Sequence, residues 1–404
     1  MSENNPDKRE IIIQAAQQVL AEKGLRKSTV AEIARRGGVF DSEIYRHFKD
    51  KEDLLFCSLA ERIKEATRDL MFQFSGIISA ANKLTKMIWF HLHINDFDSD
   101  STRILKYLLF ECRSNKNFYT HPGYQVLRDY AGIMLSILKE GVENSIFRND
   151  FNSYLVREMI LGLLDEEALG CLLIGEIEKT IPDFEPIMSL IFAIIQNGSH
   201  DSSSDDNSSG KPARIIEAAK RVFAAKGYDK ATILEVANEA RVAERTIYEY
   251  FKTKEKLLLS ISEQRFKAHK KYIESIFEPE EPLAKLQHII YHYSNLMLSD
   301  PKFAVIFLRD TRLNRKFNMK SYAYILDCIP TLYKILDEGK KEGVFREDVN
   351  NRVFRNLLLG TFSHLTVRWF VVGKVTPFAM MEELNEVTSL LCRSVTRRLD
   401  VLPL

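Results

Sequence analysis

The sequence predicts an all-α protein in which one helical unit is written twice. The chain has only 11 Pro and 17 Gly among its 404 residues, and no segment shows a convincing run of the period-two alternation that is typical of strands. Apolar residues instead recur at helical spacing, as in Ile12, Ala16 and Val19. Finally, Lys8–Leu55 aligns without a gap with Lys211–Leu258, and such internal similarity indicates a tandem repeat.

Length and composition bound the class of protein. At roughly 100–200 residues per domain, a chain of 404 residues holds two or three domains. Its 45% hydrophobic and 28% charged residues are ordinary for a globular protein and exclude disordered, collagen-like or coiled-coil compositions. The net charge of +1 gives no support to a protein that coats nucleic acid or a membrane through bulk charge, but it leaves room for a local basic surface.

The cysteines and the apolar runs predict a reduced, cytoplasmic protein. The five cysteines lie far apart with no CxxC pair, a spacing that argues against both a disulfide framework and a zinc site. The chain begins MSENNPDKRE, which has no apolar core typical of a signal peptide. No apolar run approaches the ~18 residues that a membrane-spanning helix needs. We therefore expect no membrane contact and no metal.

Each repeat is expected to consist of helices throughout. In the first, Gly24 is the expected stop of the opening helix, and the Thr29-to-Glu32 pattern is a capping box that opens the second helix and recurs from Thr232 to Glu235. A short helix around Asp41–Phe48 and a long one from Asp50 follow. Further helices are expected near 77–96, 101–113, 120–146, 152–175 and 183–197, and in the second repeat near 282–299, 301–313, 318–342, 350–373 and 377–399.

A segment without apolar residues separates the two repeats. Residues 197–210, NGSHDSSSDDNSSG, are rich in Ser, Asn and Asp, a composition that predicts a flexible linker because it cannot form a core. The expected domains are 1–55 and 56–196 in the first repeat, then the linker at 197–210, then 211–258 and 259–404 in the second repeat.

The first fifty residues of each repeat carry a specific pattern. Three short helices with a tight turn between the second and third are the layout of a helix-turn-helix unit. REIIIQAAQQVLAEKGLRKSTVAEIARRGGVFDSEIYRHFKDKEDLL resembles the N-terminal domain of TetR-family transcriptional regulators, and ARIIEAAKRVFAAKGYDKATILEVANEARVAERTIYEYFKTKEKLL resembles it again. The shared positions include Gly24/Gly227, Thr29/Thr232, Val39/Val242, Tyr45/Tyr248, Phe48/Phe251 and Lys51/Lys254.

The resemblance implies a function and an assembly. TetR-like proteins act as dimers that place one recognition helix per subunit in successive major grooves, about 34–36 Å apart. Because both recognition helices here lie on one polypeptide, we expect an intrachain pseudo-dimer. The implied function is a sequence-specific DNA-binding transcriptional regulator, expected to be a repressor released by a small-molecule inducer. No P-loop, GxSxG or GxGxxG pattern is present, so no enzyme and no cofactor is expected.

The resemblance assigns candidate DNA contacts residue by residue. Thr29 and Thr232 open the second helix of each unit, where a hydroxyl and helix N-terminal amides suit a phosphate. Further candidates for contacts to phosphate or sugar are Lys51, Lys254, Tyr45 and Tyr248, and the alternative for the two tyrosines is a role mainly in packing. The candidates for base edges are Ser42, Glu43, Arg46 and His47 in the first repeat and Arg245, Thr246, Glu249 and Tyr250 in the second. Ile44 and Phe48 are expected in the core.

The two recognition helices differ at nearly every exposed position, which predicts an operator with unlike half-sites. Phe40 and Ala243 stand where the family usually has a small polar cap, although Asp41 could cap one residue later. The carboxylates of Glu43 and Glu249 favour either contact with cytosine N4 or weakened binding. The alternative function is therefore a helix-turn-helix-derived binding or scaffold protein with impaired DNA recognition. The second helix-turn-helix, which is more basic than the first, is expected to hold DNA more strongly.

The remainder of each repeat is expected to hold a dimer interface and a pocket. The family's last two helices usually pair as a four-helix bundle. The first repeat has Asp165, Glu166 and Glu167 there and the second has His364 and Arg368, which favours pairing of unlike halves, although a solvated acidic turn is an alternative. Candidate pocket residues are Trp89, His93, Tyr107, Phe110, His288, Tyr291, His292 and Phe307, all of which could equally be core. The i,i+4 spacing of His288 and His292 is a weak metal pattern.

Overall fold

The computed structural model describes residues 7–77, 79–96, 100–195, 211–275, 281–312, 318–373 and 375–397. Over these ranges the chain is helical, and its β-structure is one isolated bridge between Phe345 and Thr396. The expected all-α class is confirmed. The predicted linker at 197–210 lies outside the described residues. The chain divides into two compact units, one of residues 1–146 with 170–181 and the other of residues 147–169 with 182–404.

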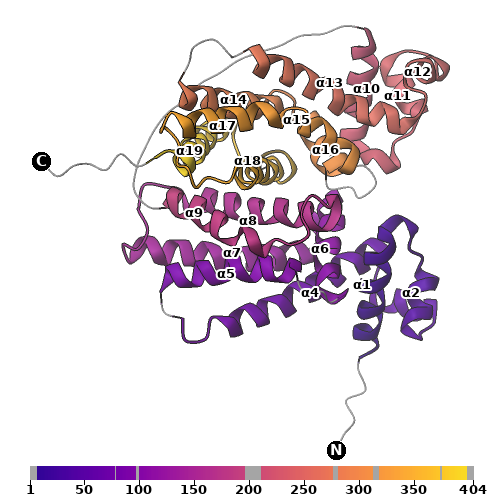
Figure 1. The fold of residues 1–404 in the computed structure, drawn as a ribbon. Helices are drawn as coiled ribbons and strands as arrows, with labels where there is room; N and C mark the ends of the chain where they lie inside the picture. Colours follow the sequence, from indigo (N-terminus) through magenta and orange to yellow (C-terminus); the bar gives the residue numbers. More distant parts are fainter. Residues whose placement is uncertain are drawn as a thin grey trace, which may run out of the picture. The chain divides into compact units, whose positions relative to one another are not determined.

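The first unit contains the first helix-turn-helix head and most of its helical body (Figure 1). Its helices are α1 (Lys8–Lys27), α2 (Val30–Gly37), α3 (Asp41–His47), α4 (Lys51–Gln73), α5 (Ala80–Asp96), α6 (Asp100–Arg113) and α7 (Pro122–Glu143), with a 3-10 turn at Lys116–Thr120 and a π-turn at Gly170–Ile174. One apolar cluster joins the head to α4 and α6: Ile12 and Ile44 are buried with Leu55 and Cys112.

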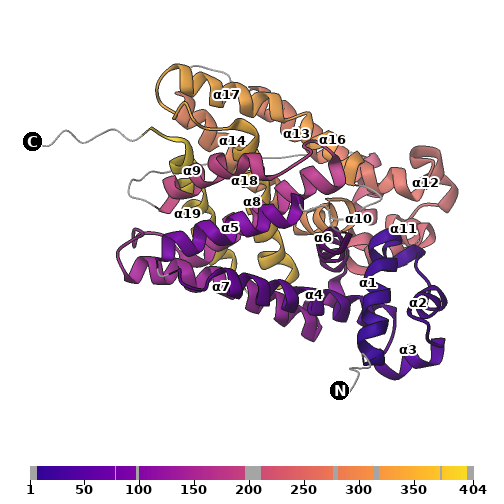
Figure 2. The same ribbon diagram turned by 60° about the horizontal axis from the view of Figure 1, so that its bottom comes forward.

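The second unit contains the whole second repeat and two helices of the first (Figure 2). From the first repeat come α8 (Ser153–Leu169) and α9 (Phe184–Ile195). From the second come α10 (Lys211–Lys230), α11 (Ile233–Ala240), α12 (Glu244–Phe251), α13 (Lys254–Ser275), α14 (Pro282–Leu298), α15 (Pro301–Ile306), α16 (Asn318–Leu326), α17 (Ile329–Lys341), α18 (Asn351–Thr366) and α19 (Pro377–Val395).

Helices α8 and α9 pack against α18 and α19 inside this second unit, so helices of both repeats form one bundle. The closest approach is between Gly162 and Gly360. A Cβ atom added at Gly162 would lie 2.3 Å from the Gly360 carbonyl oxygen, so only glycine permits the backbones to come this near. A bundle of the last two helices of each repeat is what the sequence led us to expect.

The glycine that the opening helices of the two repeats share behaves differently in each. Helix α1 continues past Gly24 to Lys27, so the expected stop at Gly24 is wrong. In the second repeat Gly227 has φ 77° and ψ 155°, which breaks the helical path inside α10. Beside this break, Asp310 Oδ1 accepts a hydrogen bond from the backbone N–H of Tyr228 at 3.2 Å. A tertiary contact thus accompanies the break in the second repeat.

Four expected helices differ from the observed ones: those expected at 152–175, 301–313 and 350–373 each continue as a π-turn, and the one expected at 318–342 is divided. The expected helix at 318–342 is two helices, α16 and α17, because Pro330 lies in the first turn of α17 and disfavours a continuous helix through the residue before it. The expected helix at 152–175 ends as α8 at Leu169 and continues as a π-turn, and α18 does the same at Val367–Val371. The repeated π-turn indicates that the two repeats share this detail.

Candidate nucleic-acid interface

The second helix of each head begins at a capped threonine. Thr29 accepts a hydrogen bond from the Glu32 N–H at 3.1 Å. In the second head the capping box is complete, because Glu235 also accepts the Thr232 N–H at 2.9 Å. The predicted second helices therefore begin where the pattern places them, and the capping bonds stabilise the first turn of each.

The recognition helices α3 and α12 begin without a side-chain cap. Phe40 and Ala243 occupy the cap positions, and neither makes a side-chain hydrogen bond to the helix. Asp41 lies in the first turn of α3, and the cap that it could have supplied is not formed. Phe40 is 82% exposed, an unusual position for a large apolar side chain that is next to a helix expected to face DNA.

Most candidate base-reading residues point to solvent. In α3, Ser42, Tyr45, Arg46 and His47 are exposed, whereas Ile44 and Phe48 are buried as expected. In α12, Arg245, Tyr248, Glu249 and Tyr250 are exposed, Thr246 is half-buried, and Ile247 is buried. The apolar residues that anchor each helix are shared between the heads. Among the exposed candidates only the tyrosine at Tyr45 and Tyr248 is shared.

Nearby cations offset the carboxylates on the recognition helices. Glu43 accepts a hydrogen bond from Lys8 at 2.9 Å and pairs with Arg46, and the Lys8 ammonium holds the pKa of Glu43 below its usual range. Glu249 pairs with Arg245 at 3.2 Å. These exposed pairs are weak in water, so each carboxylate can exchange its cation for another donor.

The two candidate phosphate-binding lysines hold the heads together internally. The Lys51 ammonium donates to the Ser28 carbonyl at 2.8 Å, and burial lowers its pKa. Lys254 donates to the Asp229 carbonyl at 3.5 Å and lies 4.5 Å from the centre of the Tyr228 ring. Both lysines thus fasten the start of a long helix to the turn before the second helix, a role that the sequence reasoning did not identify.

The candidate pocket residues of the first repeat are scattered over α5 and α6. Trp89 stacks on His93 with ring centres 4.5 Å apart, and both are half-buried. Tyr107 donates to the Leu172 carbonyl at 3.2 Å, and Phe110 is fully buried. Phe110 is thus a core residue, as the alternative interpretation of these aromatic residues held.

The candidate pocket residues of the second repeat are mostly packed side chains. Tyr291 donates to Asn385 at 3.2 Å, and Phe307 packs on Phe303. His292 faces His269 of α13 with nitrogens 2.6 Å apart. Burial lowers the pKa of His292 to about 4 and that of His269 to about 3. The pair is therefore uncharged at neutral pH, and His269 was not identified from the sequence because its partner is distant in the chain.

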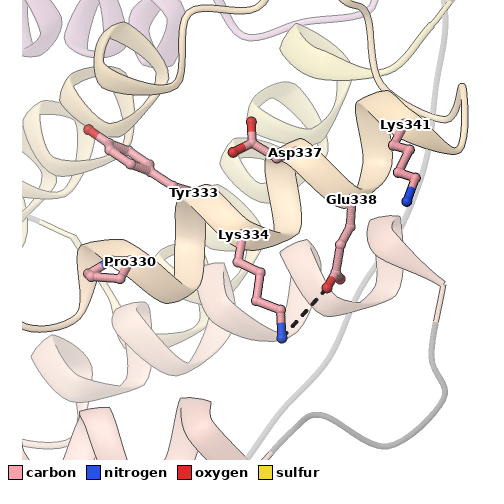
Figure 3. Close-up of a pocket in the computed structure, with 6 residues that line it drawn as sticks. All are labelled: Pro330, Tyr333, Lys334, Asp337, Glu338 and Lys341. Carbon is pink, nitrogen blue, oxygen red and sulfur yellow. Dashed lines mark ion pairs between the residues drawn. The ribbon is translucent and has the colours of Figure 1, made fainter.

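A groove of about 500 Å³ lies along α17 (Figure 3). It is lined by Pro330, Tyr333, Lys334, Asp337, Glu338 and Lys341. All six residues come from one helix, and Lys334 pairs with Glu338 at 3.8 Å across it. This shallow, charged surface does not contain any of the candidate pocket residues.

Asp53, Cys57 and His121 place three potential metal-ligand atoms within 4.8 Å of one another. His121 Nδ1 accepts the Gly123 N–H at 3.0 Å, so Nε2 carries the proton and donates to Asp53 at 2.9 Å. A metal-bound histidine instead donates from its second nitrogen. Burial raises the pKa of the Cys57 thiol to about 11. The donor set therefore fits a hydrogen-bonded link between α4 and α7 and does not fit a metal site.

Among the helices that the structure describes, none is long and apolar enough to cross a membrane.

Family models match both repeats. A model described as "Bacterial regulatory proteins, tetR family" matches residues 12–56 and 215–261. A model described as "YsiA-like protein, C-terminal region" matches residues 59–176 and 261–394. Each model thus occurs twice, and the second alone covers more than half of the chain.

Relatives with known roles resemble the chain. The Fatty acid metabolism regulator protein of Bacillus subtilis (strain 168) is 31% identical over 167 residues, which is 39% of this chain and 83% of that protein. The HTH-type transcriptional repressor NicS of Pseudomonas putida is 28% identical, over 33% of this chain and 66% of that protein. The crystal structure of FadR from Bacillus subtilis in complex with stearoyl-CoA is 27% identical, covers 45% of this chain and 96% of that chain, and has a TM-score of 0.41.

The matches to these two curated relatives each cover less than half of this chain but 83% and 66% of the relative, and both family models match the chain twice. The chain therefore belongs to the TetR family of bacterial regulatory proteins and is a helix-turn-helix, DNA-binding transcriptional regulator that carries two tandem copies of the family's subunit.

Proposed function

We propose that one chain acts as a pseudo-dimer that binds a single operator with two unlike half-sites. The observation that carries this proposal is the bundle of α8 and α9 with α18 and α19, in which the two repeats supply the two halves of one interface. Its second support is the difference between the recognition helices: Arg46 and His47 are exposed in α3, whereas Glu249 and Tyr250 are exposed in α12. Unlike side chains read unlike base pairs.

The proposed contacts are of two kinds: contacts to phosphate and sugar, which position the protein on the DNA, and contacts to base edges, which recognise the sequence. Thr29 and Thr232, with the amides of the helices that they cap, suit phosphate oxygens. Tyr45 and Tyr248 suit phosphate or sugar. Lys51 and Lys254 each donate to a carbonyl, and their remaining ammonium hydrogens are proposed to bind phosphate. The remaining candidates are proposed for base edges: Ser42, Glu43, Arg46, His47, Arg245, Thr246, Glu249 and Tyr250.

Selection of binding sites from random DNA tests this proposal. We expect two different half-sites about 34–36 Å apart, or a multiple of that distance. Replacing Arg46 and His47 by Ala should relax the preference in one half-site only, and replacing Arg245 and Tyr250 by Ala should relax the other. A palindromic preferred site, or the same half-site changed by both pairs, would overturn the proposal.

The alternative, a binding or scaffold protein with impaired DNA recognition in one or both heads, is favoured by the missing caps on α3 and α12. A salt titration separates the two possibilities, because the slope of log affinity against log salt follows the number of phosphates that are neutralised. Two working heads should give roughly twice the slope of a chain in which the second head is disabled by Arg245→Glu. An unchanged slope would show that the second head does not hold DNA.

We further propose that the chain represses transcription and that a ligand from fatty-acid metabolism releases it. The support is the name of the 31% identical relative and one buried group. Asn95 in α5 is 4% exposed, and neither polar atom of its amide has a hydrogen-bond partner among the residues that the structure describes. Buried groups of this kind call for a partner, which here would be a polar part of the ligand.

The second repeat does not share this amide. Lys83 of α5 pairs with Glu140 at 2.9 Å, and Lys285 of α14 pairs with Glu338 at 3.0 Å, so the two lysines occupy equivalent positions in the two repeats. Met297 follows Lys285 at the same spacing as Asn95 follows Lys83, and it is therefore the counterpart of Asn95. We therefore propose that the effector binds in the body of the first repeat.

Release of operator DNA by palmitate or palmitoyl-coenzyme A, followed by fluorescence anisotropy, tests the effector proposal. Asn95→Met copies the second repeat's residue, and we expect it to raise the concentration that gives half-release about tenfold, because one hydrogen bond is lost. Met297→Leu is the matched control and should leave release unchanged. No release by either compound, or an unchanged response of Asn95→Met, would contradict the effector proposal.

A further inference from the structure

Two glycine pairs fix the correspondence between α8 and α18. Gly162 and Gly360 touch at the crossing of the two helices. Gly175 and Gly373 follow at equal distances along the chain, and both have left-handed backbones with φ of 73° and 67°. In this correspondence His364 takes the place of Glu166, and Leu365 takes the place of Glu167. In a pair of two like repeats, each contact across the bundle would therefore be made by the equivalent residue of the like repeat in place of the unlike one.

Polar contacts across the bundle join acids of the first repeat to donors of the second. His364 Nδ1 lies 2.8 Å from Glu158 Oε2, and Nε2 lies 2.9 Å from Asp165 Oδ2. Only a doubly protonated imidazolium donates both of these hydrogen bonds. One histidine therefore binds two carboxylates that lie about two turns apart on α8.

Arg352 makes a second such contact. Its guanidinium pairs with Glu167 at 3.2 Å and with Asp183 at 2.6 Å, and Asn356 donates to the same Glu167 at 3.0 Å. The Glu167 side chain is fully buried. Arg368, which the sequence placed among the pairing residues, forms its direct ion pair with Glu383 of its own repeat at 2.6 Å. The hydrogen bond to Glu383 and, less strongly, the charge of Glu158 raise the pKa of Arg368. Arg368 lies in the π-turn at the end of α18, and its hydrogen-bonded partner is in α19.

Two first repeats would bring acids together. At the place of His364, each would present Glu166 to the partner's Glu158 and Asp165. Arg157 of the same repeat would still pair with Glu158, but Asp165 and Glu166 would add further carboxylates on each side and the imidazolium of His364 would be missing. Like charges at close range in a protein interior strongly oppose pairing. The crossing would again place glycine against glycine at Gly162, so the excess of acids, and not the backbone there, opposes this pair.

A pair of two second repeats would leave Arg352 without the carboxylates of Glu167 and Asp183 that it binds in the unlike pair. At the place of Glu167, each would present Leu365 to the partner's Arg352. Arg352 is half-buried, and an arginine that loses its carboxylates while it stays partly desolvated is costly. His364 would likewise face Asn356 and Ser363, which carry no charge.

We propose that the two bundle faces are a matched pair, such that each accepts only the unlike repeat and rejects a second copy of itself. The acidic face consists of Glu158, Asp165, Glu166 and Glu167, and the basic face of Arg352, Asn356 and His364. Such a device specifies the partner by penalising the wrong one as well as by favouring the right one. The inference rests on the pseudo-dimer arrangement of the proposed function, and it adds that no further assembly occurs through these faces.

A protease site inserted into 197–210 of the full chain permits the test. The protein is folded, cleaved, and mixed with an isotope-labelled, equally cleaved sample at a dilution that allows the repeats to exchange. Native mass spectrometry then counts the pairs. Random pairing would give about one half unlike pairs, whereas we expect like pairs to be under about 1%, because each like pair loses both buried ion contacts. Like pairs near the random fraction would overturn the proposal.

Charge variants show whether the named residues cause the preference. In the cleaved protein, His364→Glu should weaken the unlike pair about 100-fold or more, and Glu158→Gln should weaken it less. Glu382→Gln, an exposed acid of α19, is the matched control and should have no effect. An unaltered pair in His364→Glu would also overturn the proposal. Because no DNA is present, loss of operator binding does not change these outcomes, and failure of the two proposals is distinguishable.

Discussion

At the scale of single residues, two buried glutamates of the bundle respond to their surroundings in opposite directions. Burial raises the pKa of Glu167 to about 7, although Arg352 opposes the change. Burial also acts to raise the pKa of Glu158, but the hydrogen bond and charge of His364 outweigh it, and the pKa falls to about 2. The same interface thus contains one group that folding makes a weaker acid and one that it makes a stronger acid.

These shifts predict how stability depends on pH. The folded pKa of Glu167 lies above its unfolded value near 4.5, so its contribution is present below about pH 4.5 and is lost as the pH rises through 7. The folded pKa of Glu158 lies below its unfolded value, so its contribution is present above about pH 4.5 and is lost as the pH falls toward 2. Stability of the bundle should therefore be greatest near pH 5.

Glu167→Gln isolates the first of these effects. Glutamine resembles the protonated acid, so the loss of unfolding free energy between pH 5 and pH 8 should be smaller in the variant by about 1–3 kcal/mol. Urea unfolding at the two pH values measures this difference. An equal loss in the wild-type protein and the variant would contradict the assignment of Glu167.

At the scale of helices, the crossing of α8 and α18 depends on the absence of side chains. Gly162→Ala would force a Cβ atom against the Gly360 backbone, and we expect a loss of about 1–3 kcal/mol in the free energy of unfolding because the core is overpacked. Gly132→Ala in α7 is the control, since a Cβ atom there meets nothing within 4 Å. It should stabilise the helix by up to about 1 kcal/mol. Equal effects of the two changes in denaturant unfolding would refute the crossing.

The helices show what a sequence alone can and cannot reveal. Local signals sufficed for the heads, because Thr29 and Thr232 cap their helices through bonds to residues three positions away. Pro330 was also a local signal for the break between α16 and α17, and it was overlooked. The pairing of His292 with His269, and the link from Asp53 to His121, join distant segments. No spacing along the chain reveals such contacts.

For the candidate DNA-contacting residues too, the sequence reveals local features but not contacts between distant segments. That Ile44 and Ile247 are buried while Tyr45 and Tyr248 are exposed follows from helical periodicity. The carbonyl contacts of Lys51 and Lys254 depend on how each long helix approaches the preceding turn, and the family pattern does not specify this. The exposed residues therefore remain candidates for base contacts, and the lysines have a structural role in addition to their proposed one.

At the scale of the whole molecule, the net charge of +1 conceals an uneven distribution. The acids of α8 face the cations of α18 inside the bundle, so these charges cancel within the protein and do not act on DNA. The exposed basic residues of the heads remain available to phosphates. The duplication thus gives each repeat a distinct surface, which identical subunits of a homodimer cannot have.

The stoichiometry of the operator complex tests the central claim, a pseudo-dimer in one chain, most directly. Light scattering coupled to size-exclusion chromatography gives the mass of the protein bound to a DNA fragment that contains the selected site. We predict one chain per fragment, with both half-sites protected from cleavage. Two chains per fragment, with each chain protecting one half-site, would contradict the account.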